Sequence, residues 1–291
     1  MELKITLLSN AIGAEVTDID LACITDDQCH HAIQEALSRH GVLVIRNQTL
    51  DEATLVEFTR CFGDVHLYPF GDHVHPDNPN ILIVSNILDD SGKPIGLVDA
   101  GVTWHSDGSY EKEPPRGSVL YAREIPCDDA GNSLGDTLFS STGAAYDDLP
   151  SEIKKKLAGR TTTHSFEGKQ NLRIKQGKFK REPKSKVTLK QVPPVEHPIV
   201  CTHDQSGRKC LYVIAGECQG ISGLPEDEAT SLLDDLAERC TRPEYIYRHR
   251  WQEGDVVIWD NCLVQHLAIQ DYALPQRRLL WRTTIKGSIP A

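Results

Sequence analysis

Apolar and polar positions in the first 65 residues follow two different periods. In residues 26–40, apolar side chains recur at helical spacing, at Ala32, Ile33, Ala36 and Leu37, which predicts a helix. The apolar run within 41–48 has turn-forming residues on both sides and predicts a strand. Residues 51–63 open with an acidic first turn and end near a glycine, which predicts a second helix. This part of the chain is therefore expected to be mixed α/β.

Strand patterns dominate the rest of the chain. Short runs rich in Val, Ile and Tyr, separated by Gly, Pro, Asp and Asn, cover residues 81–86, 118–125, 197–203, 209–216, 245–251, 255–261 and 279–285. Helical patterns interrupt them at 141–159, where Pro150 starts a new helix, and at 224–240. Many short strands divided by turns are typical of a sandwich or jelly roll. We expect a mainly β fold with flanking helices, in one domain over residues 1–291.

The segment 167–191 differs from its surroundings because it has almost no apolar side chains. Between 167 and 190 it carries nine Lys or Arg and two Asp or Glu, a net charge of +7, whereas the whole chain carries −11 and the remainder therefore −18. Such a segment is not expected to enter a core. We predict a long exposed loop, and loops of this length commonly act as mobile lids.

Composition narrows the class of protein. A net charge of −11 argues against nucleic acid as the main partner. No apolar stretch approaches the roughly 18 residues needed to span a bilayer, and the first residues lack the apolar core of a signal peptide. The nine cysteines are scattered, odd in number and free of CxxC spacing, which favours reduced thiols in a cytoplasmic protein over disulfides or a cysteine zinc site.

Candidate chemistry begins at Trp104-His105-Ser106-Asp107. In an extended segment, His105 and Asp107 point to the same side, so an imidazole and a carboxylate converge there. This pair suits Fe(II), Mn(II) or Zn(II), although the motif alone is common and is as compatible with a structural role. His266, at the end of the segment 259–266, would complete a triad of two histidines and one carboxylate. Such a triad leaves open coordination positions on iron, as in non-haem Fe(II) oxygenases.

Two arginines follow this last histidine. Arg278 and Arg282 are four residues apart and share a face if 279–285 is a strand. Near a metal they would form a clamp for a dicarboxylate. Without the histidines, the same pair would be read as surface arginines at a strand end. A second group, His66, His73 and His75, allows another metal site, but local hydrogen bonding within a loop explains these histidines better.

Several segments together resemble the taurine dioxygenase / 2,4-dichlorophenoxyacetate dioxygenase family. They are WHSDGSYEKEPP, GDTLF, YRHRWQEGDVVIWDN and QHLAIQDYALPQRRLLWRTTI, and the similarity extends to GAEVTDIDL, CFGDVH and HDQSGRKCLYV. It covers nearly the whole chain in the same order. The resemblance implies a double-stranded β-helix (jelly roll) and a non-haem iron oxidoreductase. Such an enzyme uses O2 and 2-oxoglutarate, releases succinate and CO2, and oxidises an unactivated C–H bond.

The resemblance also implies roles for individual residues. Fe(II) would be bound by His105, Asp107 and His266. The distal carboxylate of 2-oxoglutarate would be held by Thr137 and Arg278, with Arg282 near the other carboxylate and near the substrate. The backbone N–H of Gly108 would face the substrate as well.

Two positions depart from the taurine enzyme. Tyr68 stands where that enzyme has the second histidine of a His-x-His-Pro run, and Gly101 stands where it has an asparagine four residues before the first iron ligand. Both belong to the taurine pocket, so Tyr68 is expected to contact a substrate other than taurine. An insertion, residues 127–134, precedes the Gly135-Asp136-Thr137 motif.

The substrate is expected to be a small organic anion, a carboxylate or sulfonate. Arg282 favours it, and so does the +7 segment, whose charge could steer anions towards the site. The alternative is that these lysines only keep a loop soluble. Two other functions remain open: a jelly-roll binding protein with a vestigial metal site, and a Zn(II)-dependent hydrolase using the same triad. We expect no membrane partner and a homo-oligomer.

Overall fold

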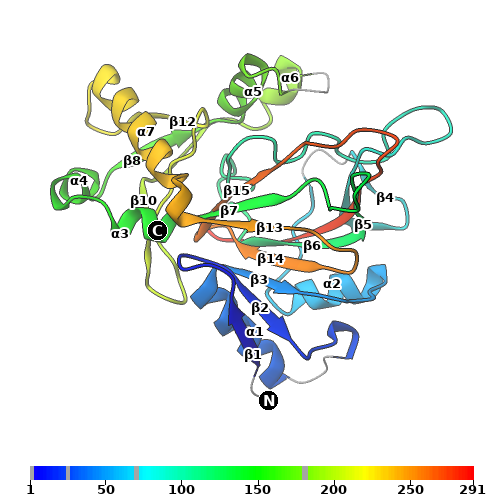
Figure 1. Ribbon diagram of the computed structural model, residues 1–291. Helices are drawn as coiled ribbons and strands as arrows, with labels where there is room; N and C mark the ends of the chain where they lie inside the picture. The colour runs from blue at the N-terminus through cyan, green and yellow to red at the C-terminus, as the bar shows by residue number, and fades with distance from the viewer. Residues whose placement is uncertain (1–2, 24–26, 69–71, 179–182) are drawn as a thin grey trace.

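Two β-sheets form the centre of the molecule (Figure 1), a computed structural model that describes residues 3–23, 27–68, 72–178 and 183–291. The larger sheet has eight strands in the order β1-β2-β3-β14-β6-β16-β5-β4. These are β1 (Lys4–Leu7), β2 (Ala14–Thr17), β3 (Val42–Ile45), β4 (Val74–His75), β5 (Asn78–Ser85), β6 (Gly117–Glu124), β14 (Val256–Asp260) and β16 (Leu279–Ile285). The smaller sheet has the order β13-β7-β15, with β13 (Ile246–His249), β7 (Thr137–Ser141) and β15 (Val264–Ala268).

The two sheets pack face to face. One apolar core contains Phe139 of β7 and Tyr247 of β13 together with Trp259 of β14 and Leu280 of β16. Each of these side chains comes from the inner face of its strand, because alternate residues of a strand point to opposite sides. The predicted jelly roll is therefore confirmed, and the inside of this roll is where a site can be built.

Two helices cover the outer face of the larger sheet, at the bottom of Figure 1: α1 (Asp27–His40) and α2 (Glu52–Arg60). Ile33, Leu37, Leu55 and Phe58, spaced three or four residues apart, pack there against the sheet. Gly41 ends α1 with φ +67°, and a Cβ at this position would lie 2.9 Å from a side-chain carbon of Ile12. Both predicted N-terminal helices are confirmed.

A second layer lies beside the smaller sheet. It consists of α3 (Thr142–Asp147), α4 (Ser151–Leu157) and α7 (Glu226–Cys240), with the strands β8 (Thr161–His164), β9 (Val195–Pro198), β10 (Val200–Thr202), β11 (Lys209–Leu211) and β12 (Cys218–Ile221). Leu157, Ile199, Leu211 and Leu236 belong to its apolar core. Short 3-10 turns occur at Leu21–Cys23 and Pro243–Tyr245. Among the described residues, no helix has both the length and the apolar character required for a membrane span.

The prediction of a loop at 167–191 is wrong for most of the described part of this segment, which is helical, although most of its described residues are exposed as predicted. It contains most of α5 (Phe166–Lys175) and all of α6 (Lys186–Leu189), which lie together at the top of Figure 1. Three residues of α5 are buried, namely Gly168, Gln170 and Arg173. Residues 179–182 lie outside the described part of the chain. Burial here relies on glycine, amide and ion-pair contacts, so a search for apolar side chains does not detect it; the mobility of the lid remains a prediction.

Candidate active site

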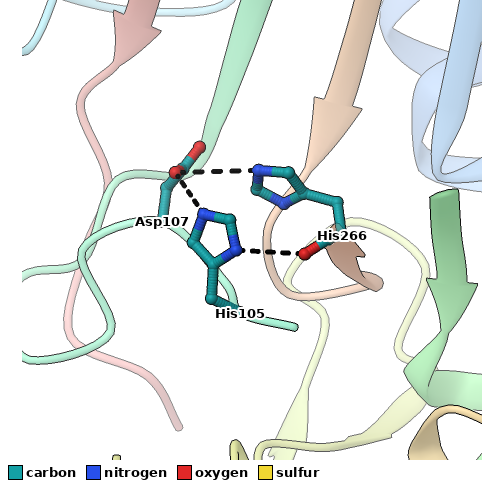
Figure 2. A group of neighbouring side chains, drawn as sticks. All are labelled: His105, Asp107 and His266. Atoms are coloured by element: carbon teal, nitrogen blue, oxygen red, sulfur yellow. Dashed lines mark hydrogen bonds and ion pairs between the residues drawn. The ribbon is translucent and has the colours of Figure 1, made fainter. Parts of the chain in front are cut away.

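Three buried side chains converge inside the jelly roll (Figure 2): His105, Asp107 and His266. Their exposed fractions are 5%, 4% and 6%. The Oδ1 atom of Asp107 lies 3.5 Å from Nε2 of His105 and 3.9 Å from Nε2 of His266. One ligand atom from each residue lies within 4.8 Å of the other two. Among the residues that the structure describes, this is the one group of His, Cys, Asp or Glu able to hold a metal in this way.

Backbone pairing brings the two ligand segments together. His105 donates its N–H to the carbonyl of His266 at 3.1 Å, and His266 donates to the carbonyl of His105 at 2.8 Å. His105 and Asp107 then point to one side, and Ser106 points to the other. There the Ser106 hydroxyl lies 2.7 Å from the carbonyl oxygen of Asn261 and 2.8 Å from that of Val264. The convergence predicted from the two-residue spacing is confirmed.

Asp107 is held in its ionised form. Burial by itself would raise the pKa of this carboxyl, but Arg282, His266 and His105 together outweigh burial and hold the pKa well below its usual range. An Arg282 Nη2 lies 3.1 Å from Oδ2, and the Ser118 hydroxyl donates to the same oxygen at 2.9 Å. Oδ1 is therefore the oxygen that faces the two imidazoles.

Both histidines present Nε2 towards this carboxylate. The Nδ1 of His105 lies 2.9 Å from the carbonyl oxygen of Thr103 and 3.0 Å from that of His266, so Nδ1 carries the hydrogen and Nε2 keeps its lone pair. Burial lowers the pKa of His266 well below its usual value, so this ring is neutral. Two neutral imidazoles and one carboxylate fit a divalent iron centre. Because the protein supplies only these three ligands, other coordination positions stay open for other molecules.

A cavity of about 640 Å³ opens onto the triad. His105, Asp107 and Arg282 line it near the ligand atoms, and Tyr68 and Gly108 line it as well. Contact of Tyr68 and Gly108 with a substrate remains a prediction. Gly108 has φ +60°, and a Cβ there would lie 2.5 Å from Cδ of Pro115.

Helix α5 and the start of α6 form one wall of this cavity through Phe166, Lys169, Arg173, Lys184 and Thr188. The three basic side chains are engaged in ion pairs. Nζ of Lys169 lies 2.8 Å from Glu217, a guanidinium nitrogen of Arg173 lies 3.1 Å from Asp99, and Nζ of Lys184 lies 3.0 Å from Asp72. Part of the +7 segment therefore builds the wall of the pocket.

Thr137 and Arg278, the two residues predicted to hold the distal carboxylate of 2-oxoglutarate, both lie beside Trp251. The Nε1 of Trp251 donates to the Thr137 hydroxyl at 3.0 Å, and the Arg278 guanidinium carbon lies 5.8 Å from the Trp251 ring centre. Arg278 is buried, with 2% of its surface exposed, and donates a hydrogen bond to the carbonyl of Gly135. Thr137 pairs with Ala268 across β7 and β15, two residues from His266. The insertion at 127–134 does not displace Thr137 from this neighbourhood.

Two histidines of the second group have carboxylate neighbours far away in sequence: His66 lies 3.2 Å from Glu111, and His75 lies 3.6 Å from Glu52. His75 also accepts a local hydrogen bond, from the N–H of Asp77 at 3.3 Å. His164 is buried and stacks on Tyr212.

Sequence reasoning missed the roles of Ser118 and Asn261 and the Lys169–Glu217 pair. The one feature of the sequence that could have indicated such a role is a serine within an apolar strand pattern, as at Ser118.

A jelly roll whose interior holds two histidines and one carboxylate defines the class of non-haem Fe(II) oxygenases. The chain matches the taurine catabolism dioxygenase TauD, TfdA family over residues 4–284. It belongs to this family, and the resemblance stated from the motifs is confirmed. The protein is a non-haem iron, 2-oxoglutarate-dependent dioxygenase; Fe(II) is its metal and 2-oxoglutarate its cosubstrate.

Curated relatives match over most of the chain. An alpha-ketoglutarate-dependent 2,4-dichlorophenoxyacetate dioxygenase of Burkholderia sp. strain RASC is 31% identical, over 88% of this chain and 84% of its own. An alpha-ketoglutarate-dependent sulfate ester dioxygenase of Pseudomonas putida is 31% identical, over 100% and 91%. These matches favour the dioxygenase over the binding protein and the hydrolase left open by the sequence.

Solved structures confirm the fold. A taurine dioxygenase from Burkholderia xenovorans superposes with a TM-score of 0.80 at 30% identity, covering 100% of this chain and 91% of that one. AAD-2, in complex with Mn(II) and N-oxalylglycine, gives a TM-score of 0.79 at 26% identity, covering 100% and 99%.

Proposed function

We propose that this dioxygenase oxidises an unactivated C–H bond of a small organic anion. His105, Asp107 and His266 hold Fe(II), which when bound supplies the activation of O2. Substrate R–H, 2-oxoglutarate and O2 give R–OH, succinate and CO2, with one oxygen atom entering R–OH and the other entering succinate. The observation that carries this proposal is the convergence of three ligand atoms within 4.8 Å of one another, at a cavity large enough for a cosubstrate and a small organic molecule.

The chain's own residues bind and orient 2-oxoglutarate. Arg278 has five N–H donors and a buried guanidinium, so it can bind a carboxylate through two parallel hydrogen bonds. The Thr137 hydroxyl, already oriented by Trp251, adds one more donor to the same carboxylate. Arg282, next to Asp107, lies where it can contact the other carboxylate and the acid group of the substrate.

An anionic substrate is supported by two observations. The named substrates of the relatives include an aryloxyacetate and sulfate esters, which carry acid groups. Among the described residues, four Lys or Arg and three Asp or Glu line the cavity, so this part of its lining is weakly positive in a strongly acidic chain. Tyr68 and Gly108 complete the substrate side of the pocket, with an N–H of Gly108 as a donor to the substrate.

The test measures succinate formed by purified protein with Fe(II), 2-oxoglutarate and O2. A panel of matched acids, amides and esters is offered at low and high salt. We expect several acids to stimulate succinate formation, their neutral analogues to do so poorly, and Asp107→Ala to abolish the stimulation. Equal turnover of neutral analogues would exclude the anionic substrate, and no substrate-stimulated succinate with any compound would count against the reaction.

A further inference from the structure

The two oxygens of Asp107 have different surroundings. Oδ1 faces the two imidazoles at 3.5 and 3.9 Å. Oδ2 accepts a hydrogen bond from the Ser118 hydroxyl at 2.9 Å and lies 3.1 Å from Arg282. Ser118 belongs to β6 and is fully buried. A carboxylate whose second oxygen is bound in this way has its plane and its free oxygen fixed before any metal arrives.

The backbone of Asp107 is fixed from a different direction. Its N–H donates to Oδ1 of Asn261 at 3.3 Å, and this side-chain oxygen also accepts from Nε1 of Trp259 at 3.1 Å. The Nδ2 of Asn261 donates to the carbonyl of Pro115 at 3.0 Å. Asn261 is 3% exposed, so water does not compete strongly for these bonds.

Asn261 therefore connects both ligand-bearing segments. It lies in the turn between β14 and β15, five residues before His266, and its side chain contacts the segment that carries His105 and Asp107. Its carbonyl oxygen also meets the Ser106 hydroxyl at 2.7 Å. A shift of this turn would change the distance between the carboxylate and the second imidazole.

We propose that Ser118 and Asn261 are positioning residues of the metal centre: Ser118 fixes the carboxylate plane of Asp107, and Asn261 fixes its backbone. Together they direct one oxygen, Oδ1, at the metal position and keep Oδ2 away from it. A carboxylate that supplies one oxygen instead of two leaves an additional coordination position open for 2-oxoglutarate or O2. This inference rests on the proposed function, since it assigns a role towards the metal held by the triad.

The experiment measures Mn(II) binding to metal-free protein by titration calorimetry, together with the melting temperature of the metal-free form. Ser118→Ala removes one hydrogen bond to Asp107, and Asn261→Ala removes the acceptor of the Asp107 N–H. Ser140→Ala is the matched control, because Ser140 is also a fully buried strand serine and its hydroxyl donates to the carbonyl of Cys240. It contacts no ligand residue through this bond.

Loss of partners that orient a metal ligand typically weakens metal binding by about 10- to 100-fold. We expect Ser118→Ala to weaken Mn(II) binding about 10-fold and Asn261→Ala by about 10- to 100-fold. Ser140→Ala should retain wild-type affinity, even though its melting temperature falls too. If Ser118→Ala and Asn261→Ala lower the melting temperature but bind Mn(II) as tightly as the wild type, their role is structural and the inference is wrong. If the wild type itself binds no Mn(II), the proposed function fails first.

Discussion

Arg278 is a buried cation whose guanidinium donates to a neutral carbonyl and also interacts with Tyr272, Asp136 and Asp271. Its guanidinium donates to Gly135, and burial lowers its pKa, because a buried charge without a full counter-charge is unfavourable. A carboxylate arriving beside it supplies that counter-charge. Binding of the distal carboxylate of 2-oxoglutarate by Arg278 stays a prediction.

Replacing Arg278 with glutamine tests this role. A charge-assisted hydrogen-bonded pair contributes roughly 1.5–3 kcal/mol, so Arg278→Gln should raise the apparent constant for 2-oxoglutarate by about 10- to 100-fold. Iron binding should change little. The neighbouring Arg277→Gln is the control, because Arg277 is half exposed and pairs with Glu124 at 3.2 Å. A flat 2-oxoglutarate constant with a collapse of substrate affinity would mean that the roles of Arg278 and Arg282 are exchanged.

At this scale the sequence predicted the triad but not the residues that support it. His105 and Asp107 are two apart, and a period of two is a property of any extended chain. Ser118 and Asn261 contact Asp107 across 11 and 154 residues of sequence. Contacts of that kind depend on strand register, which short patterns do not specify.

Among the elements, α5 illustrates how polar residues can hold a helix in place. Its Lys169 is mostly buried against Glu217, which is itself 1% exposed. Glu217 also accepts a hydrogen bond from Ser109 at 2.5 Å, two residues beyond Asp107. Helix α5 is thereby attached to the segment that carries the metal ligands.

Breaking this pair should destabilise the protein. Lys169→Met leaves a buried carboxylate without its partner, which typically costs about 3–5 kcal/mol. The double variant Lys169→Met, Glu217→Gln removes the stranded charge and should recover a large part of that loss. Denaturant unfolding measures both. Lys175→Met, at an exposed position of the same helix, should change stability by less than about 0.5 kcal/mol; an equally small effect of Lys169→Met would show that α5 is not anchored by this ion pair.

For the whole molecule, hydrophobic periodicity was sufficient to predict a sandwich or jelly roll with its main helices, and the family resemblance indicated the jelly roll. Strand β14 is apolar on both faces and is easy to detect. The strands β8 and β12, by contrast, read Thr-Thr-Thr-His and Cys-Gln-Gly-Ile, and they pair with each other in a separate sheet. These two strands show no regular alternation of apolar residues, and they pair with each other across more than 50 residues of sequence. A local pattern therefore could not reveal either strand. The same holds for the burial of α5, which depends on ion pairs with distant parts of the chain.

The buried histidine of β8 makes the stability of the molecule sensitive to acid. His164 is fully buried; burial and the charge of nearby His197 lower its pKa from 6.5 to about 3. Below pH 6.5, His164 binds a proton in the unfolded chain, whereas in the folded protein it stays neutral down to about pH 3. The free energy of unfolding therefore falls as the pH drops through this window. This one histidine lowers the free energy of unfolding with a slope that approaches about 1.4 kcal/mol per pH unit, which amounts to roughly 2–3 kcal/mol by about pH 4.5. His164→Phe, which keeps a ring beside Tyr212, should reduce the slope of this part of the profile by the share of one histidine, in denaturant titrations of the metal-free protein. His31→Asn, at a side chain that is 72% exposed, should keep the wild-type slope; the same slope in His164→Phe would show that the acid sensitivity arises elsewhere.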